Sequence, residues 1–152
     1  AFDRRAPEAF RNAQDARSSL AMAIVDLDHF KAINDEHGHL VGDDALRRVA
    51  DRIEDALRST DFVARLGGEE FAIIMPETSL EDAGQVAQRI RRGLDEMPLL
   101  TGEHHVEVTA SIGLAAQDGE DTLDALIQRA DEALYQAKER GRNRVESFET
   151  SS

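Results

Sequence analysis

Runs of apolar residues along the chain predict three strands, and a stretch of alternating apolar and polar residues predicts a fourth. Residues 20–25 are apolar without interruption, which is typical of a strand buried on both faces. Residues 62–64 and 71–75 are two further β-prone runs. The two glycines between them predict a tight hairpin turn, because glycine tolerates a positive φ. Apolar and polar residues alternate from Val106 to Leu114, which predicts one half-buried antiparallel strand.

Helices are predicted where apolar residues recur every three or four positions. We expect helices over residues 7–18, 29–38, 42–57, 79–98 and 123–141, and a weak final strand near 144–146. Ser79 followed by Asp82 resembles a capping box. A hairpin within an otherwise alternating order of helices and strands excludes an all-parallel sheet and predicts an α+β sandwich.

The length of 152 residues, 41% of them apolar, predicts a single domain over residues 1–152. No segment approaches the roughly 20 apolar residues of a membrane span, and no secretory leader is recognisable. We therefore expect a cytoplasmic location. The chain begins at Ala1 instead of methionine, so we expect it to be part of a longer protein, and the sequence leaves open whether that parent is tethered to a membrane.

The net charge of −13 argues against a nucleic-acid partner, because neutralising a long row of phosphates needs clustered Lys and Arg. It does not exclude a small nucleotide held through a divalent metal ion. The chain has no cysteine, which excludes disulfides and thiolate metal sites.

Carboxylates follow the first buried strand and the hairpin turn. Asp26 ends the strand, and strand alternation places it on the same face as Asp28. Glu69 lies at the tip of a hairpin expected to pair beside that strand. Together with the Leu27 carbonyl, Asp26 and Glu69 predict an oxygen-rich site suited to Mg²⁺. For Asp28 the favoured interpretation is an N-cap of the next helix.

Two further pairs have both structural and functional interpretations. Lys138 and Arg142 are expected on one face at the end of the last helix, where they could complement the helix dipole or bind an anion. Asn34 and Asp43 could accept hydrogen bonds from a guanine base, or could be a surface amide and an N-cap.

Other motifs of nucleotide and hydrolase sites are missing from the sequence. There is no phosphate-binding G-x-x-x-x-G-K-[ST] segment, no dinucleotide-binding glycine fingerprint and no nucleophile elbow. His37 and His39 flank Gly38, but without a third ligand at metal spacing they favour loop histidines over a zinc site.

The order and spacing of the motifs resemble those of the GGDEF family, which are bacterial diguanylate cyclases. The matching segments are Asp26-x-Asp28-x-Phe30-Lys31-x-x-Asn34-Asp35-x-x-Gly38-His39-x-x-Gly42-Asp43, Arg58-x-x-Asp61, Gly67-Gly68-Glu69-Glu70-Phe71, Ser111-Ile112-Gly113, Arg129-Ala130-Asp131-x-Ala133-Leu134-Tyr135-x-Ala137-Lys138 and Gly141-Arg142-Asn143. Residues 2–5 are similar to the end of the family's N-terminal turn motif. The resemblance covers essentially the whole chain.

The resemblance implies a nucleotide-cyclase or polymerase-palm fold, in which a mostly antiparallel sheet carries the Gly-Gly-Glu-Glu-Phe hairpin and is flanked by helices. It implies a reaction that joins two GTP molecules into cyclic di-GMP and releases pyrophosphate. Each subunit would hold one GTP, so catalysis would need a homodimer.

The resemblance also implies roles for individual residues. Asp26, the Leu27 carbonyl and Glu69 would bind two Mg²⁺ ions, or Mn²⁺ in their place, and Glu70 would join Asp26 and Glu69 as a catalytic residue. Glu69 stands where the family's name has aspartate, so a carboxylate is kept. The implied substrate-binding residues are Asn34 and Asp43 for guanine, and His29, Phe30, Lys31, His39, Gly67, Gly68, Lys138 and Arg142.

Arg58 and Asp61 match the family's inhibitory product site, with Arg89 as a candidate second arm; the other interpretation is a solvated ion pair at a helix end. The alternative function is a catalytically silent module that binds GTP or cyclic di-GMP. The intact carboxylates and hairpin glycines favour the enzyme, and Asp43 argues against a cyclase that also uses ATP.

Overall fold

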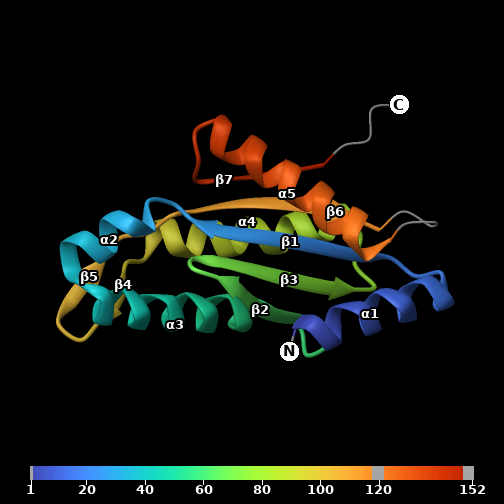
Figure 1. Ribbon diagram of the computed structural model, residues 1–152, viewed down its shortest axis with the longest axis horizontal. Helices are drawn as coiled ribbons and strands as arrows, with labels where there is room; N and C mark the ends of the chain where they lie inside the picture. Colours follow the sequence, from blue (N-terminus) through green and yellow to red (C-terminus); the bar gives the residue numbers. More distant parts are fainter. Residues whose placement is uncertain (1, 118–121, 149–152) are drawn as a thin grey trace.

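A five-stranded sheet lies between two layers of helices (Figure 1). The computed structural model describes residues 2–117 and 122–148. The helices are α1 (Phe2–Ala16), α2 (Phe30–His37), α3 (His39–Asp55), α4 (Leu80–Glu96) and α5 (Leu123–Glu139). The strands are β1 (Leu20–Leu27), β2 (Phe62–Gly67), β3 (Glu70–Pro76), β4 (Leu99–Thr101), β5 (His104–Val106), β6 (Ala110–Ala116) and β7 (Arg144–Ser147).

β1 is the central strand of the sheet, whose order is β2-β3-β1-β6-β7. It runs antiparallel to β3 on one side and to β6 on the other, and β2 is antiparallel to β3. β7 lies at the far edge, parallel to β6. β4 and β5 form a separate two-stranded sheet. A mostly antiparallel sheet flanked by helices confirms the predicted α+β class.

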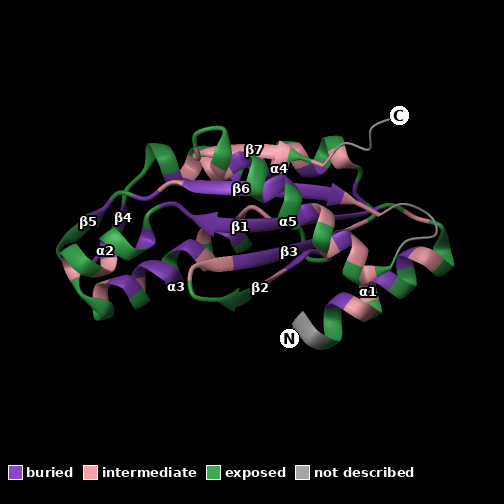
Figure 2. Ribbon diagram, turned by 45° about the horizontal axis from the view of Figure 1, so that its top comes forward, coloured by how far each residue is buried: buried purple, intermediate pink, exposed green. Residues whose placement is uncertain are grey.

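The pleat of β1 separates two parts of the hydrophobic core. Its odd-numbered residues from Ala21 to Leu27 pack with apolar residues of α2, α3 and α4. Its even-numbered residues from Leu20 to Ile24 pack with α1 and α5. The whole strand is buried (Figure 2), as its uninterrupted apolar run predicts. Asp26 continues the even-numbered series, so it lies on the α5 face of the sheet.

The segment from Val106 to Leu114 is not the single half-buried strand that its alternation predicts. Val106 ends β5 of the small sheet, whereas Ala110 begins β6 of the main sheet. β6 is buried nearly throughout. Gly113, which the pattern assigned to the solvent side, lies against the backbone of α5. Residues of β6 do alternate between the two faces of the sheet, but the small residue Gly113 faces a helix instead of water.

Two helices begin earlier than predicted. α1 begins at Phe2, so Pro7 lies inside the helix instead of starting it. α3 begins at His39 and not at Gly42. Glycine is a poor helix former, but at Gly42 an added Cβ would lie 1.8 Å from Asn34 Oδ1. The close approach of α2 to α3 therefore explains a glycine inside a helix.

The outer faces of the helices carry exposed residues, whereas the sides that contact the sheet are buried (Figure 2). Within residues 2–117 and 122–148, no helix has both the length and the apolar character needed to cross a membrane.

Candidate active site

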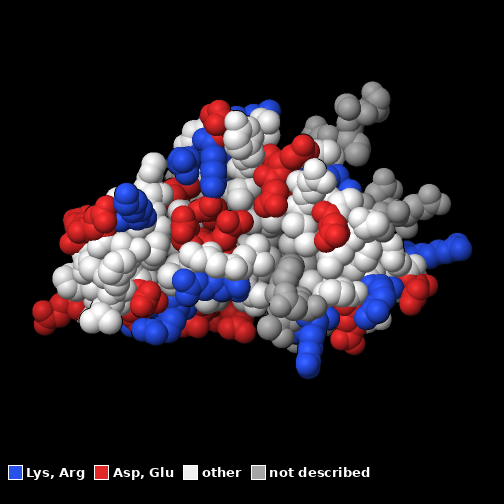
Figure 3. Space-filling view, viewed as in Figure 1, with Lys and Arg blue, Asp and Glu red and all other residues white. Residues whose placement is uncertain are grey.

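Acidic side chains meet where β1 ends and β3 begins, on the α5 face of the sheet. Asp26 lies opposite Glu70 on β3 and opposite Ser111 on β6. Residues directly opposite each other on antiparallel strands point to the same side of a sheet. In Figure 3, Asp and Glu side chains gather between the β2–β3 hairpin and the C-terminal end of α5, beside a group of Lys and Arg.

The hairpin turn brings Glu69 to the end of β1. Gly67 and Gly68 have φ angles of 155° and 50°, a region that residues with a Cβ rarely adopt. This confirms the predicted use of glycine in the turn. The backbone N–H of Leu27 donates to the Glu69 carbonyl at 3.2 Å. The two segments expected to supply metal ligands are therefore adjacent.

An ammonium group already neutralises Asp26. Lys138 Nζ donates to Asp26 Oδ2 at 2.6 Å, and the two side chains are 33% and 10% exposed. Glu70 lies beside this pair. Burial first, and then the negative charges of Asp26 and Asp131, raise the pKa of Glu70, and the charge of Lys138 opposes this rise. The site is therefore rich in negative charge that a cation stabilises.

The residues expected to hold magnesium supply suitable atoms. Asp26 and Glu69 contribute carboxylate oxygens and Leu27 a carbonyl, which are the hard ligands that Mg²⁺ prefers. Among the described residues, no three His, Asp or Glu side chains form a ready-made metal site. Metal ions here would need oxygen ligands from a bound triphosphate as well. The contact between Lys138 and Asp26 demonstrates that a cation fits against this carboxylate.

Asp28 does not cap α2, contrary to the favoured interpretation of the sequence. The N-cap residue is His29, whose φ is 54°, and α2 has no side-chain cap. The Asp28 carboxylate instead accepts hydrogen bonds from Ser111 Oγ at 2.6 Å and from Thr109 Oγ1 at 2.7 Å. It also accepts from the backbone N–H of Asn143 at 2.9 Å. Asp28 therefore ties the end of β1 to β6 and to the turn after α5.

Arg142 lies in that turn and not on the helix face expected from its spacing to Lys138, because α5 ends at Glu139. Its Nη1 atom is 3.8 Å from Asp28 Oδ1. The N-terminus of α2, with the exposed Lys31 in its first turn, follows Asp28 in the chain. The first amides of a helix have no partner within the helix and attract anions. Cationic groups and helix amides therefore converge beside the carboxylates.

The junction of α2 and α3 brings together the residues expected to bind guanine. Asn34 packs against Gly42, and the ring of Phe30 approaches the same point. Asp43 follows Gly42 in α3 and is exposed, as is His39 at the start of that helix. The polar groups expected to read a base are therefore on neighbouring helices, and their role stays a prediction.

Arg58, Asp61 and Arg89 line one cavity of about 260 Å³ beside α4. The Asp61 side chain is 2% exposed and accepts from Arg58 Nη2 at 3.1 Å. Arg58 also donates to Thr78 Oγ1 at 2.5 Å and to the Pro76 carbonyl at 2.8 Å. The hydrogen bond that Arg58 donates to Asp61 raises the pKa of Arg58. The Asp61 side chain is buried and accepts more than one hydrogen bond. It therefore does not fit the other interpretation of the sequence, which was a solvated ion pair at a helix end.

Asp131 and Arg91 were not expected at the site from the sequence. Asp131 precedes Lys138 by two turns of α5, and burial raises its pKa. Arg91 Nη1 on α4 donates to Asn143 Oδ1 at 3.0 Å, across a separation of 52 residues. Asp131 lies two helical turns before Lys138, and this spacing could have identified it in the sequence as a residue on the same face of the helix. No local pattern connects Arg91 with Asn143.

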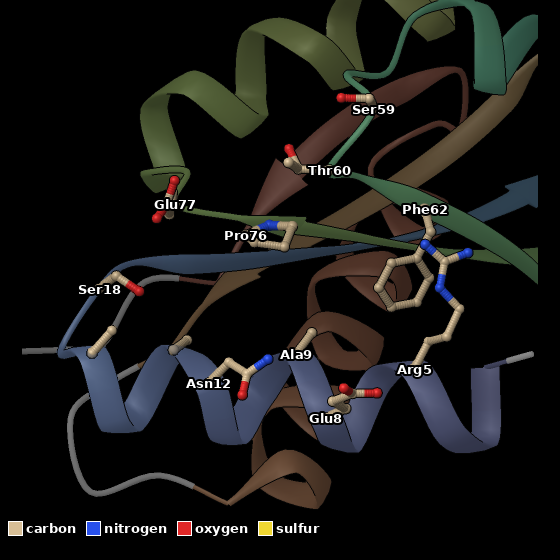
Figure 4. A pocket seen from close by; sticks show the side chains of 12 residues that line it. Arg5, Glu8, Ala9, Asn12, Ser18, Ser59, Thr60, Phe62, Pro76 and Glu77 are labelled. Atoms are coloured by element: carbon tan, nitrogen blue, oxygen red, sulfur yellow. The ribbon is translucent and has the colours of Figure 1, made fainter.

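A second cavity, of about 500 Å³, lies between α1 and the edge of the sheet (Figure 4). The Arg5 guanidinium stacks over the Phe62 ring, 4.0 Å from its centre. Ser59 and Thr60, from the loop before β2, form another part of the wall. None of the residues expected to bind metal or nucleotide lines this cavity.

Comparisons with known proteins identify relatives of this chain. A profile of the family described as diguanylate cyclase, GGDEF domain, matches residues 1–144. Diguanylate cyclase DgcP of Pseudomonas aeruginosa is 41% identical over 144 residues, which are 95% of this chain and 21% of that protein. Response regulator PleD of Caulobacter vibrioides is 48% identical over 129 residues, which are 83% of this chain and 28% of that protein. The chain thus spans well under half the length of these relatives.

Solved structures share the fold over nearly the whole chain. The GGDEF domain of DgcB from Caulobacter crescentus, in complex with c-di-GMP, has a TM-score of 0.93 and 34% identity, and the match covers 99% of this chain and 87% of that one. The active GGEEF domain of a diguanylate cyclase from Vibrio cholerae has a TM-score of 0.88 and 34% identity, covering 95% and 92%. These matches confirm the fold and the resemblance inferred from the sequence.

Proposed function

Because the chain belongs to the diguanylate cyclase GGDEF domain family, we propose that residues 1–152 form one catalytic domain that joins two GTP molecules into cyclic di-GMP and releases two pyrophosphates. The observation that carries the proposal is the contact of Asp26 with Lys138 opposite Glu70, beside the hairpin that bears Glu69. Carboxylates for metal ions next to cations for phosphates are the groups that phosphoryl transfer requires.

Asp26, the Leu27 carbonyl and Glu69 would hold two Mg²⁺ ions, or Mn²⁺ in their place. When bound, such ions neutralise the triphosphate and lower the pKa of an attacking hydroxyl. Glu70 lies opposite Asp26 and would add a ligand or accept the proton of the 3′-hydroxyl. Burial and the neighbouring carboxylates raise its pKa, which makes the ionised carboxylate a stronger base.

Lys138 and Arg142 would donate to the β- and γ-phosphates, together with the backbone amides of residues 29–31 at the start of α2. The hairpin would leave room for the α-phosphate. An added Cβ at Gly67 or Gly68 meets nothing within 4 Å, so the space in front of both residues is open.

Asn34 and Asp43 would select guanine over adenine. An amide oxygen and a carboxylate accept hydrogen bonds from the N–H groups on guanine's pairing edge, which adenine cannot supply in the same arrangement. His39, exposed at the start of α3, would contact the same nucleotide.

The reaction would take place between two copies of the chain. One site holds one GTP, and in the product each 3′-oxygen is bonded to the other nucleotide's α-phosphorus. A two-fold symmetric dimer places two identical sites face to face and serves both bonds equally. Cyclic di-GMP held by Arg58, Asp61 and Arg89 would inhibit the enzyme.

The direct test is to incubate the domain with GTP and Mg²⁺ and to separate the nucleotides by chromatography. Cyclic di-GMP should appear at a rate that rises more than in proportion to protein concentration. A fusion to a parallel coiled coil, which forces dimers, should remove that dependence. No cyclic di-GMP from either form would overturn the cyclase and favour a silent module that binds GTP or cyclic di-GMP.

Glu69→Gln should lower turnover at least about a hundredfold, because the metal site loses an anionic ligand. Its unfolding free energy should stay within about 0.5 kcal/mol of the parent, since Glu69 lies in a turn. Glu103→Gln, in the exposed turn between β4 and β5, is the matched control and should retain full activity. Unchanged turnover in Glu69→Gln would contradict the metal assignment.

A further inference from the structure

The turn after α5 has an unusual backbone. Gly141, Arg142 and Asn143 have consecutive positive φ angles of 123°, 64° and 46°. Arg142 and Asn143 are not glycines, so this conformation costs free energy in each of them. Three successive residues of this kind persist only where surrounding contacts hold them in place.

Two backbone hydrogen bonds fix the turn. The N–H of Arg142 donates to the Ala137 carbonyl at 2.9 Å, which closes the end of α5. The N–H of Asn143 donates to Asp28 Oδ2 at 2.9 Å. Asp28 is itself held in place, because its side chain is 2% exposed and accepts hydrogen bonds from both Ser111 and Thr109 of the β6 region.

The side chain of Asn143 is held from the opposite direction. Its Oδ1 atom accepts from Arg91 Nη1 of α4 at 3.0 Å. The Arg91 side chain is 17% exposed, and its Nε donates to Gln88 Oε1 at 2.9 Å. Hydrogen bonds thus hold the turn between the end of β1 and α4, two elements whose apolar residues pack in the same core.

Arg142 is the residue whose side chain this turn positions. Its guanidinium is 3.8 Å from Asp28, and its side chain is 39% exposed. Its guanidinium is therefore partly exposed beside Asp28, which lies two residues after Asp26 in the chain, and the backbone angles of the turn set the direction in which this side chain leaves the chain. Neither Arg91 nor Asn143 needs to contact substrate to influence this direction.

We propose that Asp28, Asn143 and Arg91 are positioning residues that hold the turn in its left-handed conformation and so aim Arg142 at the terminal phosphates of the nucleotide. The inference rests on the proposed function, because it assumes the phosphate role of Arg142. If these residues act in this way, Arg91 of α4 controls the affinity of the domain for the triphosphate and not for the base.

The test is the affinity, by calorimetry with Mg²⁺, for a GTP analogue with a methylene group between the α- and β-phosphates, compared with GMP. Arg91→Met should weaken analogue binding about tenfold and leave GMP binding unchanged. Arg92→Met removes the next arginine of the same helix, which is exposed, and should change neither. Asn143→Gly should reproduce the Arg91→Met result, since glycine keeps the positive φ but removes the acceptor Oδ1.

A double-mutant cycle distinguishes positioning from a general structural effect. In an Arg142→Ala background, Arg91→Met should cause no further loss of analogue affinity. Additive losses, or an equal loss for the analogue and GMP, would overturn the inference. If Arg142→Ala alone leaves analogue binding unchanged, the phosphate role fails as well, and the fault then lies in the proposed function.

Discussion

At the scale of single residues, Lys138 competes for the carboxylate that a divalent ion needs. Its ammonium contacts Asp26 Oδ2 at 2.6 Å. A hydrogen bond between charged groups is worth roughly 1.5–3 kcal/mol. Lys138→Met should therefore tighten Mn²⁺ binding about tenfold or more in the absence of nucleotide, as measured by the paramagnetic resonance signal of free Mn²⁺. Triphosphate binding should weaken in the same variant, since a phosphate partner is lost.

Arg140→Met is the control for this prediction. Arg140 also lies at the end of α5, but it pairs with Glu146 at 2.9 Å and makes no contact with Asp26 that would be lost. Mn²⁺ binding should be the same as in the parent protein. If Lys138→Met binds free Mn²⁺ no more tightly than the parent, Lys138 does not compete with the metal ion for Asp26.

The two aspartates at the end of β1 illustrate what could be predicted for single residues. The place of Asp26 beside the carboxylate hairpin could be predicted from its position at a strand end, whereas its role stays a prediction. Asp28 was assigned to a cap because only its neighbours in sequence were visible. Its actual partners Thr109, Ser111 and Asn143 are 81, 83 and 115 residues away. Contacts over such distances depend on strand register, which one sequence does not display.

At the scale of elements, the packing of α5 on β6 depends on Gly113. A Cβ at this position would lie 2.2 Å from the Leu134 backbone nitrogen and 2.3 Å from the Ala130 carbonyl oxygen. Gly113→Ala should therefore push α5 away from the sheet and destabilise the protein by about 1–3 kcal/mol. A lower denaturation midpoint in urea would measure the loss. Lys138 moves with α5, so triphosphate affinity should fall too.

Gly84→Ala is the matched control for Gly113→Ala. Gly84 lies inside α4, and an added Cβ would make only an ordinary contact, 3.8 Å from Leu114 Cδ1. Alanine is a better helix former than glycine, so this variant should gain roughly 0.5–1 kcal/mol. A comparable loss of stability in both variants would mean that the tight contact at Gly113 is not the cause.

Most helices and the β2–β3 hairpin were predicted more successfully than the segment from β4 to β6, for a physical reason. α4 and α5 have long apolar stripes with polar outer faces, and their N-caps Ser79 and Thr122 each accept a backbone N–H. In β6, Ser111 and Gly113 interrupt the apolar residues and imitate a solvent face. Small residues beneath a closely packed helix give the same alternating pattern as polar residues in water.

At the scale of the whole molecule, β2 and β3 connect the two candidate sites. Asp61 directly precedes β2 and Pro76 ends β3, whereas the opposite end of the pair carries the turn with Glu69. A strand of six residues spans roughly 20 Å. Each motif could be recognised in the sequence, but their placement at opposite ends of one hairpin follows from the register that pairs Phe62 with Ile74.

This separation predicts that the proposed product inhibition can be removed without loss of the proposed catalysis. Arg89 is exposed and lines the cavity of Arg58 and Asp61. Arg89→Met should weaken cyclic di-GMP binding at least about tenfold, since a charged hydrogen-bond donor is lost, and should leave the initial rate of turnover unchanged. Progress curves with added cyclic di-GMP measure the inhibition, and calorimetry measures the binding.

Arg58→Met tests a residue of the same cavity that we expect to contribute both to product binding and to stability. Arg58 donates to Asp61, Thr78 and the Pro76 carbonyl, so its loss leaves the buried Asp61 carboxylate with fewer partners. We expect this variant to lose inhibition and also about 2–3 kcal/mol of stability, whereas Arg89→Met keeps its melting temperature. If Arg89→Met is inhibited as strongly as the parent, the product does not bind in this cavity. If it loses turnover as well, the two ends of the hairpin are not independent.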